Sequence, residues 1–377
     1  MSDIIIKEVK TRKQIRQFIN FPLKLYKGNK YFVPCLYCDE KAIFKKDYLY
    51  NEQASHKAFL AYRDNKVVGR VMGIIQHVSN EKWNQKRVRF NRFDCIDDLK
   101  VSDALFKTIE QYAKENGMNE IVGPLGFSDM EREGLLIEGF DYLSTFEEQY
   151  NYPYYQKLIE HYGFIKEVDW VERRLFPSKE KDPKNRLERI ANIVMKKNKF
   201  HFAEAKSTND FLKKYKDDFF TLCDETYKDL YQTVPFSEKI KKSLISSFKL
   251  ILNNKYFGVI LNENNEPVCF GLLFPELGSS LQKSGGRLYP WTLIKLLHSI
   301  RHPKIYDLGL IGVKKEYLNT GVASVMIHYM NGYLNNGKTK YMETNLNLED
   351  NNHIISIWSN FDNIQHKRRR SFVKKVD

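Results

Sequence analysis

The stretch 313-VKKEYLNTGVASVMIHYMNGYLNNG-337 decides the fold, because a single glycine, Gly321, joins a strand-like run to an apolar helix. The helix carries an apolar stripe that repeats every 3.6 residues. It comprises Val322, Val325, Met326, Tyr329, Met330, Tyr333 and Leu334. A helix N-terminus has unpaired N–H groups and partial positive charge, and a glycine there lets a phosphate approach the backbone. The stretch is therefore a pyrophosphate cradle or a helix cap without a ligand.

The elements around this stretch form the second copy of a weak internal repeat. The first copy predicts helices and strands at 11–26, 58–75 (a hairpin turning at Asp64-Asn65), 87–96, 101–117, 119–125, 153–164 and 165–176. The second copy predicts them at 208–227, 237–252, 256–274 (a hairpin), 304–313, 321–336, 339–346 and 351–361. This order predicts an α/β fold with a central parallel pair of strands. We expect domains at 1–180 and 201–377, joined by a charged linker at 181–200.

Composition narrows the class of protein without choosing a partner. A chain of 377 residues suits two domains, and 42% hydrophobic residues supply sizeable cores. The net charge of +14 favours polyanionic partners. Cys35 and Cys38 form a lone CxxC without a second ligand pair, so we expect no zinc site. No signal peptide and no run of about 18–20 apolar residues is present, so we expect a cytoplasmic protein without a membrane span.

The order strand, cradle, helix, strand, helix, preceded by a hairpin, resembles the GNAT superfamily of N-acetyltransferases. The family's cradle reads Gln/Arg-x-x-Gly-x-Gly/Ala. It is matched here by Leu318, Asn319, Thr320, Gly321, Val322 and Ala323, although Leu318 departs from the leading Gln or Arg. The resemblance implies two tandem GNAT-like domains, each a mixed, mostly antiparallel sheet flanked by helices. It also implies acetyl-CoA or another acyl-CoA as co-substrate, with no metal.

Further site residues follow from the same resemblance. The strand end at Ile311 and Val313 is similar to the segment whose backbone pairs with pantetheine, and Asn351 opens a helix near the cofactor. The matching turn of the first copy, 96-IDDLKVSDAL-105, has no glycine and carries Asp97, Asp98 and Asp103. Carboxylates repel phosphate at that range. We therefore expect a degenerate first cradle and one acyl-CoA site, in the second domain.

Acyl transfer to an amine needs a base for the amine and a donor for the departing thiolate. Glu343 and Asp307 are the candidate bases. Each is alternatively a solvent-exposed charge at the end of a strand, and for Asp307 this alternative is preferred. The family's acid is often a Tyr seven residues after the Asn, but Trp358 stands there and cannot transfer its N–H proton. Tyr341 or Tyr317 would replace it, unless solvent assists or catalysis has been lost.

Three segments admit two interpretations each. The acid-rich and aromatic run 131–155 lines a pocket for an amine acceptor between the domains, or is an ordinary interdomain surface. The insertion 278–304 forms a lid or acceptor wall, or is a packed helical insertion. The basic tail 366–377 touches nucleic acid or the 3′-phosphate of CoA, or is an exposed edge strand protected by its charge.

The sequence thus favours an acyl-CoA-dependent N-acetyltransferase whose amine acceptor is unknown. An aminoacyl-tRNA-dependent transferase is one alternative, which the net charge fits but the lack of sustained heptads opposes. A non-catalytic acyl-CoA-binding or protein-binding module is the other, suggested by Trp358. Nucleic acid is not the favoured partner.

Overall fold

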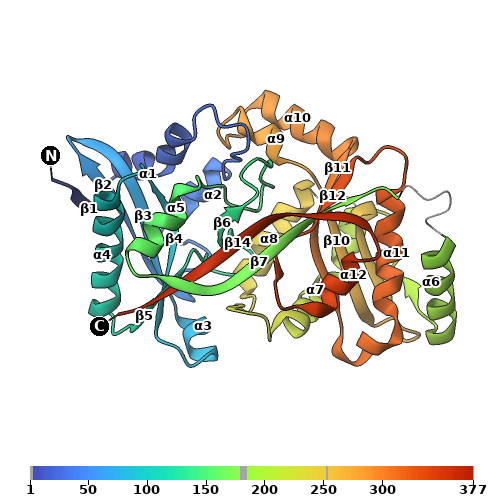
Figure 1. Cartoon of the computed structure of the whole chain (residues 1–377). Coiled ribbons are helices and arrows are strands. Elements are labelled where there is room, and N and C mark those ends of the chain that lie inside the picture. Colours follow the sequence, from blue (N-terminus) through green and yellow to red (C-terminus); the bar gives the residue numbers. More distant parts are fainter. Residues whose placement is uncertain (1–2, 179–184, 252–253, 377) are drawn as a thin grey trace.

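One mixed sheet runs through both halves of the molecule in the computed structural model, which describes residues 3–178, 185–251 and 254–376 (Figure 1). Along the sheet the strands follow the order β1-β2-β3-β4-β5-β14-β7-β12-β11-β10-β9-β8, with β6 paired to β14 and β13 paired to β7. Most neighbours are antiparallel, and the parallel pairs are β4 with β5 and β11 with β12. The predicted fold class is confirmed.

The first half has the elements that the first repeat predicts, with short additions. They are β1 (Ile5–Glu8), α1 (Arg12–Leu25), α2 (Tyr37–Ala42), β2 (Ala54–Arg63), β3 (Lys66–Gln76), α3 (His77–Lys82), β4 (Arg87–Cys95), α4 (Leu99–Glu115), β5 (Glu120–Gly123), β6 (Leu135–Glu138), α5 (Tyr154–His161) and β7 (Ile165–Phe176). Thr11 starts α1 with a capping box. Asp64 and Asn65 both have positive φ angles, which suit the tight turn between β2 and β3.

The second half repeats this order and adds an insertion between β10 and β11. Its elements are α6 (Asn185–Asn198), β8 (His201–Phe202), α7 (Thr208–Tyr227), α8 (Glu238–Ile251), β9 (Phe257–Leu261), β10 (Pro267–Pro275), α9 (Gly278–Gln282), α10 (Pro290–Arg301), β11 (Ile305–Val313), α11 (Val322–Leu334), β12 (Tyr341–Glu343), β13 (Asn347–Leu348), α12 (Asn352–Trp358) and β14 (Asp362–Lys375). Short 3-10 turns lie at Asn254–Tyr256 and Lys315–Thr320.

The boundary between the two predicted domains stays a prediction. Of the expected linker 181–200, residues 181–184 lie outside the described residues, and most of the remainder forms α6, which packs against α11. No helix among the described residues combines the length and the apolar character that crossing a membrane requires.

Each half of the chain has a main hydrophobic core, formed where an apolar helix face packs on the sheet. Val101, Leu105 and Ile109 of α4 are fully buried against strands of the first half. Val322, Val325, Met326 and Met330 of α11 are buried in the same way in the second half. The apolar stripe of the deciding stretch is therefore the face that holds α11 on the sheet, with Tyr329 and Tyr333 at its edge.

The last strand of the chain lies in the middle of the sheet. β14 pairs with β5 and β7 of the first half, so it closes the first half from the far end of the sequence (Figure 1). The interpretation of the basic tail as an exposed edge strand is therefore wrong. Its charges are tolerated because Lys367 and Arg369, which are at most 1% exposed, meet buried carboxylates from both halves.

Removing the Lys367 charge tests this arrangement. Lys367 Nζ lies 3.0 Å from Glu343, 3.2 Å from Glu172 and 3.6 Å from Glu148. Lys367→Met should lower the free energy of unfolding in urea by about 3–5 kcal/mol, because buried carboxylates lose their counter-charge. Lys375→Met, at an exposed position of the same strand, should change it by about 0.5 kcal/mol or less. Equal losses from the two variants would contradict this role of Lys367.

Candidate functional site

A wedge opens in the sheet of the second half where β11 and β12 separate. The two strands pair only from Ile305 to Asp307 on β11 and from Tyr341 to Glu343 on β12. Beyond that point the chain after β12 turns to β7, where the Thr344 N–H donates to the Arg173 carbonyl at 2.8 Å. Two parallel strands that part in this way leave backbone groups without sheet partners at the fork.

A bulge in β11 lies at the same fork. Gly309 and Leu310 together face one residue of β10, Leu272, because the register shifts between the pairs on either side. The Asn345 side chain spans the fork by donating from Nδ2 to the Gly309 carbonyl at 3.0 Å. Bulges redirect backbone groups and are common beside active sites.

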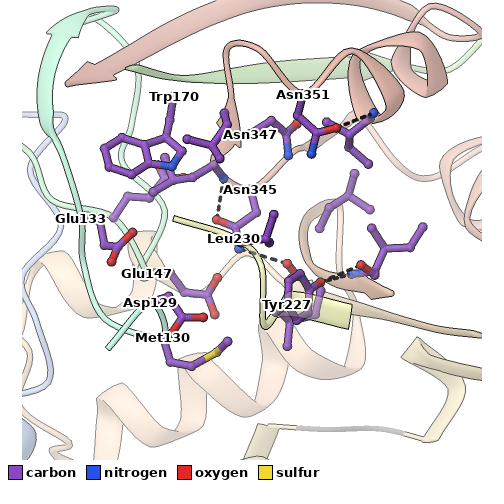
Figure 2. A pocket seen from close by; sticks show the side chains of 18 of the residues that line it. Asp129, Met130, Glu133, Glu147, Trp170, Tyr227, Leu230, Asn345, Asn347 and Asn351 are labelled. Carbon is purple, nitrogen blue, oxygen red and sulfur yellow. Dashed lines mark hydrogen bonds between the residues drawn. The ribbon is translucent and has the colours of Figure 1, made fainter. Parts of the chain in front are cut away.

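A pocket of about 280 Å³ occupies the wedge and reaches into the first half of the chain. Its walls come from the bulge of β11, the segment 345–348, α12, the end of α7, and the first-half segments 129–133 and 147–148. Figure 2 shows the carboxyl groups of Asp129, Glu133 and Glu147 on one side, with Tyr227 and Asn345 beside them. Of the predicted site residues, Ile311 and Asn351 line this pocket, whereas Glu343 and Tyr341 do not.

Tyr227, at the end of α7, contacts the backbone at the bulge through its hydroxyl group. The hydroxyl accepts from the Ile311 N–H at 3.1 Å and donates to the Ile311 carbonyl at 2.6 Å. Burial raises the pKa of Tyr227 well above its ordinary value, so the phenol remains a donor at neutral pH. The strand backbone that the resemblance assigns to the co-substrate is therefore held by a phenol that stays protonated and makes both of these hydrogen bonds to Ile311.

The carboxyl groups in the pocket differ in their protonation. Burial raises the pKa of Glu147 to about 7, while the Arg132 guanidinium opposes the rise. Burial also raises the pKa of Asp129, although its carboxylate accepts from the Val234 N–H. Glu133 is buried beside Asp129 and its pKa is raised much further, so it stays protonated. Glu147 thus has the pKa that suits proton transfer at neutral pH.

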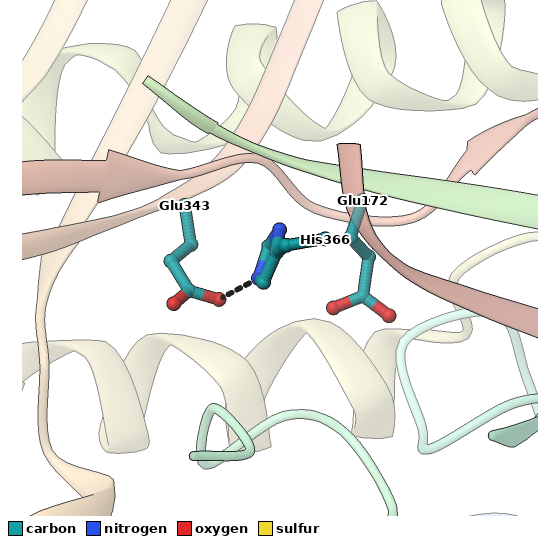
Figure 3. A group of neighbouring side chains, drawn as sticks. All are labelled: Glu172, Glu343 and His366. Carbon is teal, nitrogen blue, oxygen red and sulfur yellow. Dashed lines mark hydrogen bonds and ion pairs between the residues drawn. The ribbon is translucent and has the colours of Figure 1, made fainter. Parts of the chain in front are cut away.

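Glu343 lies instead in a buried ion cluster (Figure 3). Its carboxylate meets Arg174, the His366 ring at 2.9 Å and Lys367 at 3.0 Å. Burial alone would raise the pKa of Glu343, but these cations hold it well below its ordinary value. A general-base role for Glu343 stays a prediction, and it would have to act with a carboxylate that is already fully paired.

The same cluster contains Glu172, Glu343 and His366, whose ligand atoms lie within 4.8 Å of one another, a spacing compatible with metal ligation. The positive charge there comes from Lys367, since its ammonium contacts both carboxylates. Burial would lower the pKa of Lys367, but Glu172, Glu343 and Glu148 together raise it above its ordinary value. The ammonium therefore remains charged and supplies the charge that a cation would otherwise bring.

Two other predicted catalytic residues, Tyr341 and Asp307, do not line the pocket. Tyr341 stacks on the Arg174 guanidinium, whose centre lies 3.9 Å from the ring centroid. Asp307 is 3% exposed, so its interpretation as a solvent-exposed strand-end charge is wrong. Burial, together with the charge of Glu343, raises the pKa of Asp307 well above its ordinary value, so it is uncharged.

Asn351 and Trp358, the two residues singled out at the last helix, both line the pocket. Asn351 is the N-cap of α12, where its Oδ1 accepts from the Ile354 N–H at 3.2 Å, and it lines the pocket. Trp358 is buried, and its indole N–H donates to the Asn347 carbonyl oxygen Oδ1 at 2.8 Å. Trp358 therefore fixes the segment after β12 and closes one wall of the pocket.

The predicted cradle has a left-handed backbone at its glycine. Gly321 has a φ of +86° and separates the 3-10 turn from α11. The Thr320 hydroxyl accepts from the Val322 N–H at 3.4 Å and donates to the Tyr317 carbonyl. A Cβ at Gly321 would lie 2.9 Å from Val194 of α6, so the glycine also lets α6 approach. Whether Leu318, Asn319, Gly321, Val322 and Ala323 hold a pyrophosphate stays a prediction.

The corresponding turn of the first half already has its helix N-terminus satisfied. Asp98 is the N-cap of α4 and accepts from the Lys100 N–H at 2.9 Å. Its other oxygen pairs with Arg63 at 2.7 Å. A carboxylate of the chain itself thus occupies the position that favours an anion.

Tyr227 and Glu147 were not singled out from the sequence. The acid-rich run 131–155 was a signal for Glu147, since it suggested a pocket between the domains, but it holds several other acids. Tyr227 lies at the end of a helix whose pattern predicts only packing. Neither residue lies in the cradle motif, so its spacing could not identify them.

No family model matches the chain. Among curated proteins, Protein YghO of Escherichia coli is 22% identical in an alignment covering 99% of this chain and 95% of that protein. The bacterial ceramide synthase of Caulobacter vibrioides is 24% identical over 84% of this chain and 82% of that protein.

Solved structures match over nearly the whole length of this chain. A tandem GNAT protein from the clavulanic acid biosynthesis pathway has a TM-score of 0.58 at 9% identity, covering 100% of this chain and 99% of that one. The glucosamine N-acetyltransferase region of a fungal beta-N-acetylglucosaminidase has a TM-score of 0.56 at 12% identity, covering 99% of this chain and 38% of that one. The chain therefore has the tandem GNAT fold that the sequence resemblance predicted.

Alanine at Gly321 tests the packing of α6 on the cradle. Gly321→Ala should lower the free energy of unfolding by more than the roughly 1–2 kcal/mol that a left-handed backbone costs an L-residue, because the new methyl group meets Val194. Gly337→Ala is the matched control, since Gly337 has a φ of +77° and open space around it. Urea denaturation measures the free energy of unfolding of both variants, each with and without Val194→Ala. Adding Val194→Ala should remove the excess loss of Gly321→Ala and leave the loss of Gly337→Ala unchanged. Indistinguishable losses without Val194→Ala would mean that α6 does not restrict this turn.

Proposed function

We propose that the protein is an acyl-CoA-dependent N-acyltransferase that joins the acyl group to an amine of an amphiphilic acceptor. The observation that carries the proposal is Glu147, a carboxyl group with a pKa of about 7 that faces the wedge from the opposite half of the chain. The tandem GNAT fold supports acyl transfer as the reaction class. Acetyl-CoA or another acyl-CoA is the co-substrate in this proposal.

In this proposal the acyl-CoA lies along the wedge. The backbone of Ile311 and Val313 would pair with its pantetheine arm, and the turn from Leu318 to Ala323 at the start of α11 would receive its pyrophosphate. Asn351 would contact the arm from α12. The thioester would then reach the bulge at Gly309 and Leu310. Its carbonyl oxygen would replace the Tyr227 hydroxyl as the acceptor of the Ile311 N–H, and the hydroxyl, released from the Ile311 carbonyl, would be the second donor.

Glu147 and Tyr227 have different roles in this scheme. Glu147 takes one proton from the acceptor's ammonium group, so that the neutral amine attacks the thioester carbon. The bond from carbon to sulfur breaks, and the thiolate leaves. Tyr227 hydrogen-bonds to the oxygen or sulfur that gains negative charge, and the second amine proton passes to the thiolate or to solvent. The products are an amide and CoA.

The acceptor class follows from a second cavity that shares Glu147 with the first. This cavity has a volume of about 340 Å³ and lies between α1, the 146–150 segment and the α9 turn. Its apolar wall includes Ile19, Pro22, Leu23, Phe32, Phe146 and Leu281. The remaining lining includes charged residues, among them Glu40, Arg70 and Arg92, so a group held at Glu147 has a cavity with one apolar wall beside it. A hydrocarbon chain gains about 0.8 kcal/mol for each methylene buried there.

The Caulobacter relative supports this acceptor class. Its name is that of a ceramide synthase, and a ceramide contains an amide between a fatty acyl group and a long-chain amino alcohol. An acceptor of that kind combines the amine that Glu147 would deprotonate with the chain that the second cavity would hold. The sequence similarity, together with the second cavity, makes a long-chain amino alcohol the first acceptor to test.

Release of CoA, followed with a thiol reagent, tests the reaction and the acceptor together. The purified chain with a panel of acyl-CoA thioesters should release CoA when given a detergent-dispersed long-chain amino alcohol, and far more slowly with ethanolamine. Equal rates with both amines would reject the amphiphilic acceptor. CoA binding without release from any amine would reject the enzyme and favour a binding module.

Replacing Glu147 tests the base. Glu147→Gln should lower kcat by roughly 10²–10⁴-fold. In the unmodified protein kcat/KM should rise with pH through about 7, as the Glu147 carboxyl ionises, and the variant should lose this dependence. Glu133→Gln is the matched control, because Glu133 in the same pocket is already protonated and its replacement should leave the rate at pH 7 nearly unchanged.

Thermal unfolding gives a second, independent measurement on the same variant. The folded-state pKa of Glu147, about 7, lies above the ordinary glutamate value, so the folded state holds a proton that the unfolded state has released between these values. The resulting stability is present below the unfolded-state pKa and is lost as pH rises through about 7. Glu147→Gln should therefore raise Tm at pH 8 but not at pH 4. An unchanged rate together with an unchanged Tm difference would remove Glu147 from the mechanism.

A further inference from the structure

Helix α10 rests on the protein through a narrow side, where Leu296 and Ile300 are half-buried, and turns its other large apolar residues outward. Within the helix only Thr292 is buried, and Ser299 meets Ser280 of α9 with their hydroxyl oxygens 3.3 Å apart. By contrast, Trp291 is 58% exposed, Ile294 68% and Leu297 49%. We call the outward residues the α10 face: Leu288, Tyr289, Trp291, Leu293, Ile294 and Leu297.

This arrangement reverses the usual one, in which a surface helix buries its apolar stripe and exposes polar residues. Single exposed apolar residues are ordinary, but a contiguous group on one helix marks a surface that binds something. α10 lies at the periphery of the molecule beside α9 (Figure 1). Its outward side is therefore open to a large partner.

The formally charged residues in the segment that carries the α10 face are all cations. Between residues 277 and 304 the sequence has no Asp or Glu, and it has five cations: Lys283, Arg287, Lys295, Arg301 and Lys304. Except for Arg287, which is half-buried beside Tyr37 and Asn20, these cations are exposed. Lysines and arginines next to a membrane surface each add about 1 kcal/mol of attraction to anionic lipid.

The aromatic residues at the start of α10 fit the boundary between headgroups and acyl chains. Tyr289 and Trp291 stack with their ring centroids 4.6 Å apart. Tyr and Trp concentrate at this boundary because their rings are apolar and their O–H and N–H groups remain hydrated. An apolar face with aromatic residues and a cationic rim is the pattern of a helix that lies on a bilayer rather than across it.

We propose that the α10 face docks the protein on the surface of a bilayer that contains anionic lipid. The neighbouring α9 turn lines the second cavity, which Glu147 also lines, through Leu281 and Gly285. Docking at α10 therefore brings the membrane surface to the side of the molecule on which this cavity lies. The proposal rests on the exposed face and its charge, and it holds whether or not the acceptor is a lipid.

Vesicle co-sedimentation of the full chain tests the docking. We expect binding to vesicles of phosphatidylcholine and phosphatidylglycerol in equal amounts, and much weaker binding to phosphatidylcholine alone. Ile294→Glu should weaken the binding by roughly 10-fold or more, because one apolar side chain leaves the bilayer and a negative charge enters. Ile193→Glu is the matched control: Ile193 of α6 is 65% exposed, close to the 68% of Ile294, and its replacement should leave binding unchanged.

Three results would overturn the proposal. The first is the failure of the unmodified chain to bind the anionic vesicles, and the second is an equal loss of binding from both isoleucine variants. The third is a dimer, seen by analytical ultracentrifugation, that Ile294→Glu dissociates, because the α10 face would then cover a second copy. CoA release with detergent-dispersed acceptor should be the same for Ile294→Glu and the unmodified chain. Docking and catalysis can therefore fail independently.

Discussion

The pairing of buried charges on β14 is the interaction on which the rest of the structure depends. Lys367 and Arg369 enter the interior of the sheet only because Glu148 and Glu172 from the first half and Glu343 from the second half surround them. An unpaired charge at any of these positions would cost several kcal/mol. Because the partners come from both halves, the ion cluster also ties the end of the chain to its beginning. The two halves consequently share one sheet instead of meeting at a polar interface.

That shared sheet determines where a pocket can form. β7 belongs to the first half, yet it supplies the strand to which the chain turns after β12, and this turn opens the fork between β11 and β12. The first half also sends Glu147 into the fork, one residue before Glu148, which is held by the ion cluster. Neighbouring carboxyl groups thus have different tasks: Glu148 contacts the cations that join the halves, and Glu147 faces the cavity with a pKa near neutrality.

The sequence predicts the local structure well and the long-range arrangement poorly, for identifiable reasons. Asp64-Asn65 and the apolar stripe of α11 act within a few residues, so turn chemistry and helical periodicity were sufficient. β14 was misjudged because its run of basic residues is ordinarily typical of a solvated strand. The carboxylates that neutralise the run lie about 20 to 220 positions away and could not be paired from spacing. Asp307 was misjudged because alternation along a strand cannot show which of its two faces is covered, and Asp307 is buried.

The insertion between β10 and β11 connects these features in a single stretch of chain. β11 carries the bulge at Gly309 and Leu310, and the residues directly before β11 form α9 and α10. The α9 turn contributes to the wall of the apolar cavity, while α10 presents its apolar residues outward. A hydrophobic face that only stabilised the fold would be turned toward α9, where the serine contacts are instead. The outward orientation therefore costs the fold apolar burial, and such a cost is expected where a surface serves binding rather than stability.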